Sequence, residues 1–238
     1  MNVVISQPFF LPWLGLFEQI RLADIFVHCD DCQLPQGRSF IRKVELKTSQ
    51  GPMWLTVPLI NKKSRCKISE ARIDESKEWK YQHLEAFRHS YSRAPYFKIM
   101  FDLAKTIYDF PGNNLGDFNQ NAIEIIAEWL GLQRRILRSS ELGVTSRSSQ
   151  RVLDICLHLG AKRYITGLGA LNYLDHSLFE EHNIEVCYMR YNKTPYPQLY
   201  GEFTPYVTVL DAIANCGKQA SCLLTSDAIY WRDFIDQT

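Results

Sequence analysis

Residues 3–17 read Val3-Val4-Ile5-Ser6-Gln7-Pro8-Phe9-Phe10-Leu11-Pro12-Trp13-Leu14-Gly15-Leu16-Phe17. Three apolar residues followed by Gln7-Pro8 are typical of a buried strand that a proline ends. Pro12 suits the first turn of a helix, where its missing N–H costs nothing, and apolar residues at helical spacing follow it. Residues 25–27 are again apolar and predict a second strand. The segment therefore predicts a β–turn–α–β unit.

Polar side chains follow both of these predicted strands. Gln7 comes after the first strand, and Asp30, Asp31 and Gln33 come after the second. The carboxyl ends of parallel strands are where ligands usually bind, so these groups are candidates for a site. Surface loops also carry such residues routinely, and that interpretation stays open.

The bulk composition excludes several classes of protein. The chain has 238 residues, 46% of them apolar, which is enough for a sizeable core. Its 27 basic and 26 acidic residues give a net charge of +1, so we expect no dedicated nucleic-acid binder. The N-terminus lacks a basic lead and reaches Glu18 too early to span a bilayer. Seven scattered cysteines lead us to expect reduced thiols and a cytoplasmic protein without a membrane span.

Strand and helix patterns alternate along the rest of the chain. Strands at 39–46 and 54–59 flank a turn and predict a hairpin or an adjacent pair of strands, the first of them with a basic side. Helical patterns fill most of a segment at about 76–131. A second β-α-β series follows, with strands at 136–142, 163–166 and 184–188 and helices at 151–159, 175–181, 205–215 and 226–235. We therefore predict one α/β domain over residues 1–238, with a mainly parallel sheet built from βαβ units and a helical insertion or annex.

Two short motifs are candidates for a chemical role. Cys29-x-x-Cys32 has no second pair to complete a zinc site, and its two enclosed acids would raise thiol pKa values, so we expect neither a metal nor a redox pair. Thr166-Gly167-Leu168-Gly169-Ala170 follows a predicted strand and lets a ligand approach the backbone. It lacks the remaining residues of a phosphate loop, so a plain tight turn remains an alternative. The polar residues after it that could orient a sugar are Asn172, Tyr173 and Asp175.

Basic residues form two further candidates. Arg42 and Lys43 could neutralise an anionic substrate. Lys62, Lys63, Arg65 and Lys67 form the densest basic run, which is either a solvated loop or a loop that closes on a phosphate.

Several segments together resemble the WbqC-like protein family over nearly the whole chain. They are Gln7-Pro8-x-x-Leu11-Pro12-Trp13-x-Gly15, Ala23-Asp24-x-Phe26-Val27-x-x-Asp30-Asp31-x-Gln33, Trp54-Leu55-Thr56-Val57-Pro58, Tyr164-Ile165-x-Gly167-x-Gly169-Ala170-x-x-Tyr173-Leu174-Asp175, Tyr196-x-Gln198 and Phe203-x-Pro205-x-x-x-x-Leu210-Asp211-x-x-x-Asn215-x-Gly217. The resemblance implies a context of bacterial cell-surface polysaccharide (O-antigen type) synthesis. This chain departs from the family in having Ser6 where a histidine is common, and Lys43 where an asparagine is often found.

The resemblance implies a transferase that attaches an acyl or aminoacyl group to a nucleotide-linked amino sugar. In this hypothesis Asp30 or Asp31 accepts the amine proton, which requires a carboxylate with a raised pKa. The expected substrate-binding residues are Gln7, Trp13, Gln33, Arg42, Lys43, Gly167, Gly169, Asn172, Tyr173, Asp175 and Gln198. The alternatives are a non-catalytic module that binds a nucleotide-linked sugar or a partner, and an adenylate-forming enzyme with a nucleotidyltransferase-like fold. We assign no cofactor and no oligomeric state, and the expected partners are small molecules.

Overall fold

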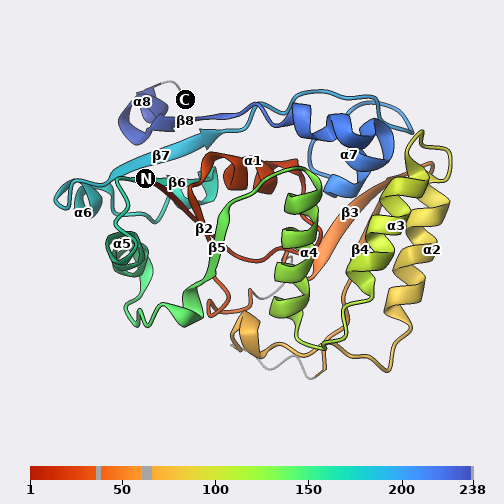
Figure 1. Cartoon of the computed structure of the whole chain (residues 1–238), viewed down its shortest axis with the longest axis horizontal. Helices are drawn as coiled ribbons and strands as arrows, with labels where there is room; N and C mark the ends of the chain where they lie inside the picture. The colour runs from red at the N-terminus through yellow and green to blue at the C-terminus, as the bar shows by residue number, and fades with distance from the viewer. Residues whose placement is uncertain (36–38, 61–65, 237–238) are drawn as a thin grey trace.

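A computed structural model describes residues 1–35, 39–60 and 66–236 (Figure 1). The strands are β1 (Asn2–Ser6), β2 (Ile25–His28), β3 (Lys43–Thr48), β4 (Gly51–Thr56), β5 (Arg135–Arg138), β6 (Arg163–Thr166), β7 (Glu185–Arg190) and β8 (Asp227–Tyr230). The α-helices are α1 (Leu14–Leu22), α2 (Trp79–Tyr91), α3 (Phe97–Tyr108), α4 (Leu115–Trp129), α5 (Ser148–His158), α6 (His176–Glu180), α7 (Val209–Cys216) and α8 (Trp231–Asp236). Helices α2 to α4 occupy the segment expected to be helical.

Six of the described strands form one sheet in the order β5-β2-β1-β6-β7-β8. Strands β5, β2, β1, β6 and β7 are parallel to their neighbours, and β8 pairs antiparallel with β7. The prediction of an α/β fold with a mainly parallel sheet is confirmed. The chain builds outward from β1 in both directions, so the strand order reverses between β1 and β6. In open α/β sheets such a reversal opens a crevice at the carboxyl ends of the strands.

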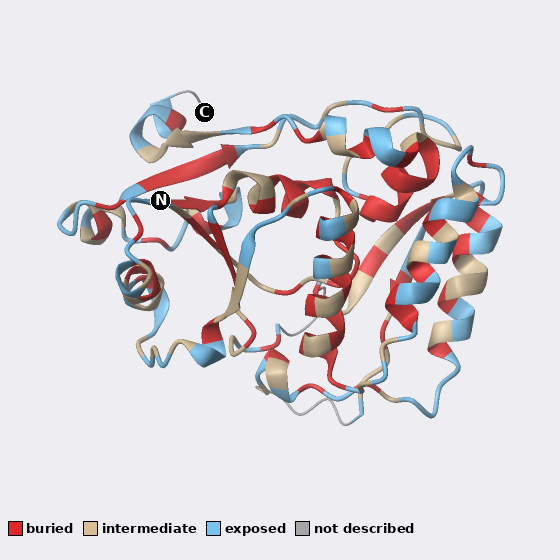
Figure 2. Cartoon of the chain, viewed as in Figure 1, coloured by how far each residue is buried: buried red, intermediate tan, exposed pale blue. Residues whose placement is uncertain are grey.

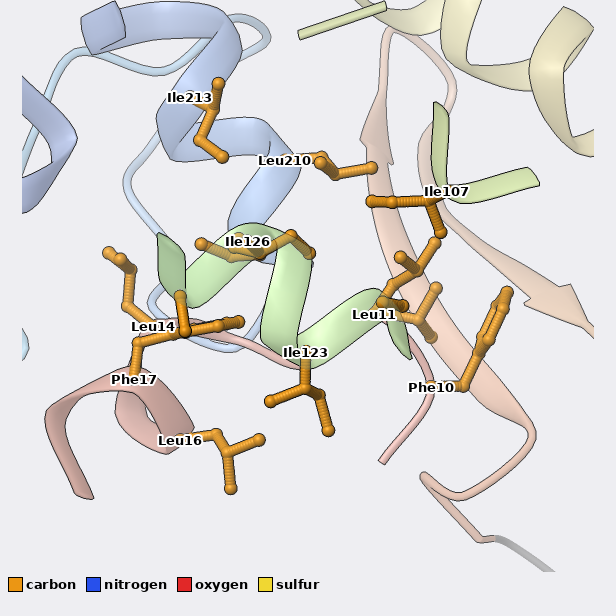
Figure 3. Close-up of a cluster of buried hydrophobic side chains, with 14 of the residues drawn as sticks. Phe10, Leu11, Leu14, Leu16, Phe17, Ile107, Ile123, Ile126, Leu210 and Ile213 are labelled. Carbon is orange, nitrogen blue, oxygen red and sulfur yellow. The ribbon is translucent and has the colours of Figure 1, made fainter. Parts of the chain in front are cut away.

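The opening stretch forms the predicted β–turn–α–β unit because its alternate side chains fill two separate cores. Val4 lies on one face of the sheet in a core with Phe17 of α1, and Val3 lies on the other face with Leu153 of α5. Helices α1, α4 and α7 contribute to the first core, and α5, α6 and α8 contribute to the second. Figure 3 shows Ile123 and Ile126 of α4 between side chains of α1 and α7. The red segments of Figure 2 mark these buried positions.

A buried carboxylate ties α1 to the far end of the chain. Glu18 is fully buried, and its Oε1 accepts bonds from the backbone N–H groups of Thr225 (2.7 Å) and Ser226 (2.9 Å). Arg21 donates to Glu18 Oε2 at 3.0 Å. A buried charge needs such partners, so Glu18 serves packing rather than chemistry.

Strands β3 and β4 form the predicted hairpin as a separate two-stranded sheet. The predicted boundaries are wrong by several residues, because the first strand begins at Lys43 and the second ends at Thr56. Arg42 therefore precedes β3, while Lys43 opens it. In Figure 1 the helices α2 and α3 lie beside this hairpin, at the opposite end of the molecule from α5, α6 and α8.

The prediction of one helix over 226–235 is wrong in its first half. Residues 227–230 form β8, whose Ile229 pairs with Tyr188 and whose Asp227 pairs with Arg190 of β7. The pairing partner lies about forty positions away, so helical periodicity in a short terminal segment could not reveal it. Within the described residues, no helix is both long and apolar enough to cross a membrane.

Candidate functional site

The carboxyl ends of the central strands meet at one edge of the sheet, which we call the carboxyl edge. In the ladder Ser6 pairs with His28, and His28 pairs with Arg138. Strand β6 ends at Thr166 beside β1, so the loops that begin at Gln7 and Gly167 flank the reversal of strand order. Gln19 of α1 lies against Gly167, where an added Cβ would come within 3.0 Å of its Nε2. The structure thus brings Gln7, Asp30 and Gly167 to a common edge.

Asp30 and Asp31 hold the loops after β2 and β5 together. Asp30 is buried, and its carboxylate accepts from Ser139 Oγ (3.2 Å), the Ser140 N–H (3.1 Å) and Ser140 Oγ (2.7 Å). Asp31 accepts from Ser139 Oγ at 2.5 Å and pairs with Arg151 of α5 at 2.6 Å. Both carboxylates are occupied by the chain itself, which favours a positioning role; their role as proton acceptors stays a prediction.

Between these loops, Cys29 and Cys32 form a disulfide, with Cα atoms 5.8 Å apart. The expectation that all seven cysteines are reduced thiols is therefore wrong for this pair. A turn of three residues brings two Cα atoms into the range that a disulfide requires, which spacing alone could not distinguish from a reduced pair. Asp31 and the two sulfurs come within 4.8 Å of one another, but sulfurs bonded together are not thiolate ligands.

The N-terminal turn of α5 connects the loop after β2 with the loop after β6. Arg151 holds Asp31, and Ser149 Oγ accepts from the backbone N–H of Asp175 at 2.9 Å. Asp175 caps α6 by accepting from the Leu178 N–H at 3.3 Å, a structural use of its carboxylate. Gly169, Asn172 and Tyr173 are exposed on the same loop.

Four aromatic rings form a row beside the carboxyl edge, which we call the aromatic row. Its ring centroids are separated by 5.6 Å from Phe9 to Trp13, 5.6 Å from Trp13 to Phe40 and 6.1 Å from Phe40 to Trp54. Phe40 and Trp54 are 46% and 48% exposed, which is unusual for large rings already in contact. Gly15 permits this arrangement, because an added Cβ would lie 2.3 Å from Trp13 Nε1.

The predicted basic residues are divided between several places. Arg42 Nη1 donates to the Val57 carbonyl at 3.4 Å, and Lys43 stands opposite Thr56 on the hairpin. Lys43, Glu45 and Trp54 share the partly exposed face of β3 and β4, since Glu45 pairs with Trp54. Gln33 is exposed and bridges to Lys67. Lys62, Lys63 and Arg65 lie outside the described residues.

Gln198 lies in a different, internal cluster, which we call the Gln198 cluster (Lys47, Tyr196, Gln198 and Asp211). Gln198 Oε1 accepts from Lys47 Nζ at 3.0 Å, and its Nε2 donates to the Tyr196 hydroxyl at 2.9 Å. The Tyr196 hydroxyl donates to Asp211 Oδ1 at 2.8 Å. Burial raises the pKa of the fully buried Asp211. These contacts fix the loop before α7 onto β3. Both atoms of the Gln198 amide form hydrogen bonds within the chain.

A second cluster lies at the carboxyl edge, and we call it the His28 cluster (His28, Gln120 and Glu124). His28 and Gln120 are fully buried, and neither side chain has a hydrogen-bond partner among the described residues. His28 Nε2 lies 3.7 Å from Glu124 Oε1. Burial lowers the pKa of His28 to about 3 and raises that of Glu124. His28 is therefore a neutral imidazole at pH 7, next to a half-exposed carboxyl group.

The neighbours of the His28 cluster are charged and well connected. Arg138, beside His28 in the ladder, pairs with Asp117 at 2.8 Å. Asn119 Nδ2 donates to the carbonyls of Pro8 (2.8 Å) and Ile41 (2.6 Å), which fixes α4 against the loop that leaves β1. Polar residues on a helix facing a strand end were the available sequence signal, but helical spacing alone could not show which strand α4 covers.

Two open hollows lie elsewhere, at the amino ends of β6 and β7. One of about 580 Å³ and one of about 390 Å³ share Arg163, Asn183 and Glu185. Arg163 and Glu185 pair at 2.8 Å and are both about half exposed. A shallow hollow around a surface ion pair lacks the converging loops of the carboxyl edge, where parallel sheets bind ligands.

Comparison with known proteins identifies the family of this chain. The profile of the WbqC-like protein family matches residues 7–222. The chain belongs to the WbqC-like family. An uncharacterised protein of Mycobacterium tuberculosis, Rv1507c, is 32% identical over 222 residues, covering 92% of this chain and 95% of that protein. No solved structure matches the chain.

Proposed function

We propose that this WbqC-like protein is a transferase of bacterial cell-surface polysaccharide synthesis, which attaches an acyl or aminoacyl group to a nucleotide-linked amino sugar. The observation that carries the proposal is that the loops after β1, β2, β5 and β6 leave the sheet at its carboxyl edge, where β1 and β6 flank the reversal of strand order. Two of these loops carry Gln7 and Gly167, and an α/β crevice of this kind suits a nucleotide-linked ligand.

The aromatic row supports the class of substrate. Sugar rings and nucleobases both present flat faces that stack on aromatic side chains, with about 1–3 kcal/mol per stacked base. Trp54 is half exposed, and Lys43 is its neighbour on the same face of the hairpin. A ring on Trp54 and Phe40 would place a linked phosphate near Lys43 and Arg42, where cations stabilise it.

The proposed reaction joins an amine to an activated acyl group. The amine nitrogen of the sugar forms a bond to the acyl carbonyl carbon, and the bond from that carbon to the donor's leaving group breaks with its electron pair. The proton lost by the nitrogen passes to a carboxylate. Gln7, Gln33, Asn172 and Tyr173 would orient the sugar, while Asp30 and Asp31 hold the loops around it.

A non-catalytic sugar-binding module is the second candidate. The observation that favours it is the occupation of both Asp30 and Asp31 by serine and arginine donors, which leaves neither carboxylate unengaged. Such a protein would bind the nucleotide-linked sugar through the same crevice and the aromatic row without transferring a group.

The test is incubation of the purified protein with acyl and aminoacyl thioesters and a nucleotide-linked amino sugar, with products weighed by mass spectrometry. The proposal expects an added acyl or aminoacyl mass on the sugar, and Trp54→Ala should raise KM about tenfold or more by removing a stacking face. Tyr81→Ala, which removes an exposed ring on α2, is the matched control. Binding of the sugar without any product supports the second candidate, and release of pyrophosphate from ATP with a carboxylic acid would support adenylate formation.

A further inference from the structure

Two fully buried side chains at the carboxyl edge lack any partner in the described part of the chain. Both nitrogens of His28 and both amide atoms of Gln120 are unpaired. Leaving buried polar groups unpaired is costly, and most buried polar groups in proteins have a protein or water partner. Four such atoms on two side chains therefore leave hydrogen-bonding capacity that a polar group could satisfy.

The unpaired groups belong to two elements, β2 and α4, that local geometry brings together. Gln120 precedes Glu124 by one helical turn, so both side chains lie on the same face of α4. Glu124 Oε1 lies 3.7 Å from His28 Nε2, which places this face over the end of β2. Asp117, one turn earlier, pairs with Arg138, whose backbone is beside His28 in the ladder. The stripe Asp117-Gln120-Glu124 thus covers the ends of β2 and β5.

The chemistry of these groups selects the kind of ligand. Glu124 is half exposed and connects the buried atoms to solvent. A neutral imidazole and an amide each offer one acceptor atom, and the carboxylate of Glu124 adds a negative charge. The nearest positive group, Arg138, is already paired with Asp117. An acceptor-rich, acidic niche fits a primary amine, whose N–H groups need acceptors.

We propose that the His28 cluster binds the amino group of the acceptor sugar, with Glu124 receiving its proton. This inference rests on the proposed function and assigns the nucleophile's place within it. His28 and Gln120 hold the nitrogen, and Glu124 takes the proton as the new C–N bond forms. Glu124 is the catalytic residue in this scheme, and Asp30, which lies near His28, acts as a positioning residue.

The binding test uses D-glucosamine against D-glucose, which differ in the amine. We expect the ring ¹⁵N signals of His28 to shift on titration with glucosamine and not with glucose. Glu124→Gln should weaken the glucosamine response about tenfold or more, as expected for a lost charge-assisted hydrogen bond. Glu128→Gln, an exposed position one turn further along the same face of α4, is the matched control and should leave it unchanged.

The outcomes separate this inference from the proposed function. The amine site is overturned by an equal response to both sugars or by no shift of the His28 signals with glucosamine. An unchanged response in Glu124→Gln overturns it too. Selective amine binding without product in the transfer assay leaves the site standing and overturns the transferase proposal. Product formation that Glu124→Gln does not slow leaves the transferase standing and overturns the role of Glu124. A second variant, Gln120→Leu, keeps the test valid if Glu124→Gln folds poorly.

Discussion

The Gln198 cluster and the His28 cluster are both buried and polar, yet their hydrogen bonding differs. In the first, Lys47, Gln198, Tyr196 and Asp211 bond to one another, and only Asp211 Oδ2 is unpaired within the described residues. In the second, His28 and Gln120 have four unpaired atoms. The contrast teaches that motif membership does not identify a site. Gln198 and Asp211 belong to segments that resemble the family and they support the fold, whereas the polar groups of the second cluster lack hydrogen-bond partners in the described residues.

The largest effect on stability is expected from removing the carboxylate at the centre of the Gln198 cluster. Asp211→Ala leaves the Tyr196 hydroxyl without its buried acceptor, while the Asn215 amide keeps its bond to the Asp211 backbone carbonyl. We expect a loss of about 3–5 kcal/mol in the free energy of unfolding, measured by urea titration. Asp211→Asn keeps the shape and one acceptor, and should lose less. A loss below about 1 kcal/mol in the alanine variant would show that the cluster does not support the fold.

The next prediction concerns the contribution of His28 to the pH dependence of stability. The folded pKa of His28, about 3, lies below its ordinary value of 6.5, so the unfolded chain binds the extra proton. Stability is complete above pH 6.5 and falls as the pH drops toward 3. Between pH 6.5 and 5 the imidazole should contribute a loss of about 2 kcal/mol. The charged groups facing it are Asp30, Arg138 and Glu124.

Comparison with His28→Phe isolates that contribution. The pKa of His83 is also lowered by burial, to about 4, but this residue is present in both proteins and cancels in the difference. Urea titrations at pH 6.5 and 5 should therefore show a shallower loss in the variant. Parallel losses in the two proteins would mean that His28 is solvated or paired in the folded state.

The sequence predicted the parts of this molecule that depend on local patterns. Periodicity and prolines predicted β1, α1 and β2, and the carboxyl-end rule predicted that Gln7 and Asp30 would face a shared edge. Strand β8 was missed because its pairing with β7 is non-local. Gln120 was missed as a site residue because its importance depends on missing partners, which only the packed structure reveals. The roles of Asp30 and Asp31 stay predictions, since their contacts serve the loops.

A smaller effect on stability is expected from a change in the His28 cluster. Gln120→Leu replaces two unpaired polar atoms with apolar atoms of similar volume. We expect unfolding of the free protein to become harder by about 1 kcal/mol, because the desolvation cost of the amide disappears. The same variant should respond less to glucosamine. A destabilised Gln120→Leu protein would instead indicate that ordered water or the chain holds the amide. That result would argue against the binding of an amine by Gln120.

The smallest effect on stability is expected at the amino ends of β6 and β7, where an exposed ion pair serves as a reference for surface charge. Arg163 and Glu185 pair at 2.8 Å, but both side chains are about half exposed. Solvent screens such a pair, so a double-mutant cycle with Arg163→Met and Glu185→Gln should give a coupling of only about 0.5 kcal/mol. None of these variants should alter the response of His28 to glucosamine, since the pair lies at the other end of the strands. A coupling above about 2 kcal/mol, or a changed response, would mean that the hollow at this edge is linked to the carboxyl edge and that the two cannot be treated separately.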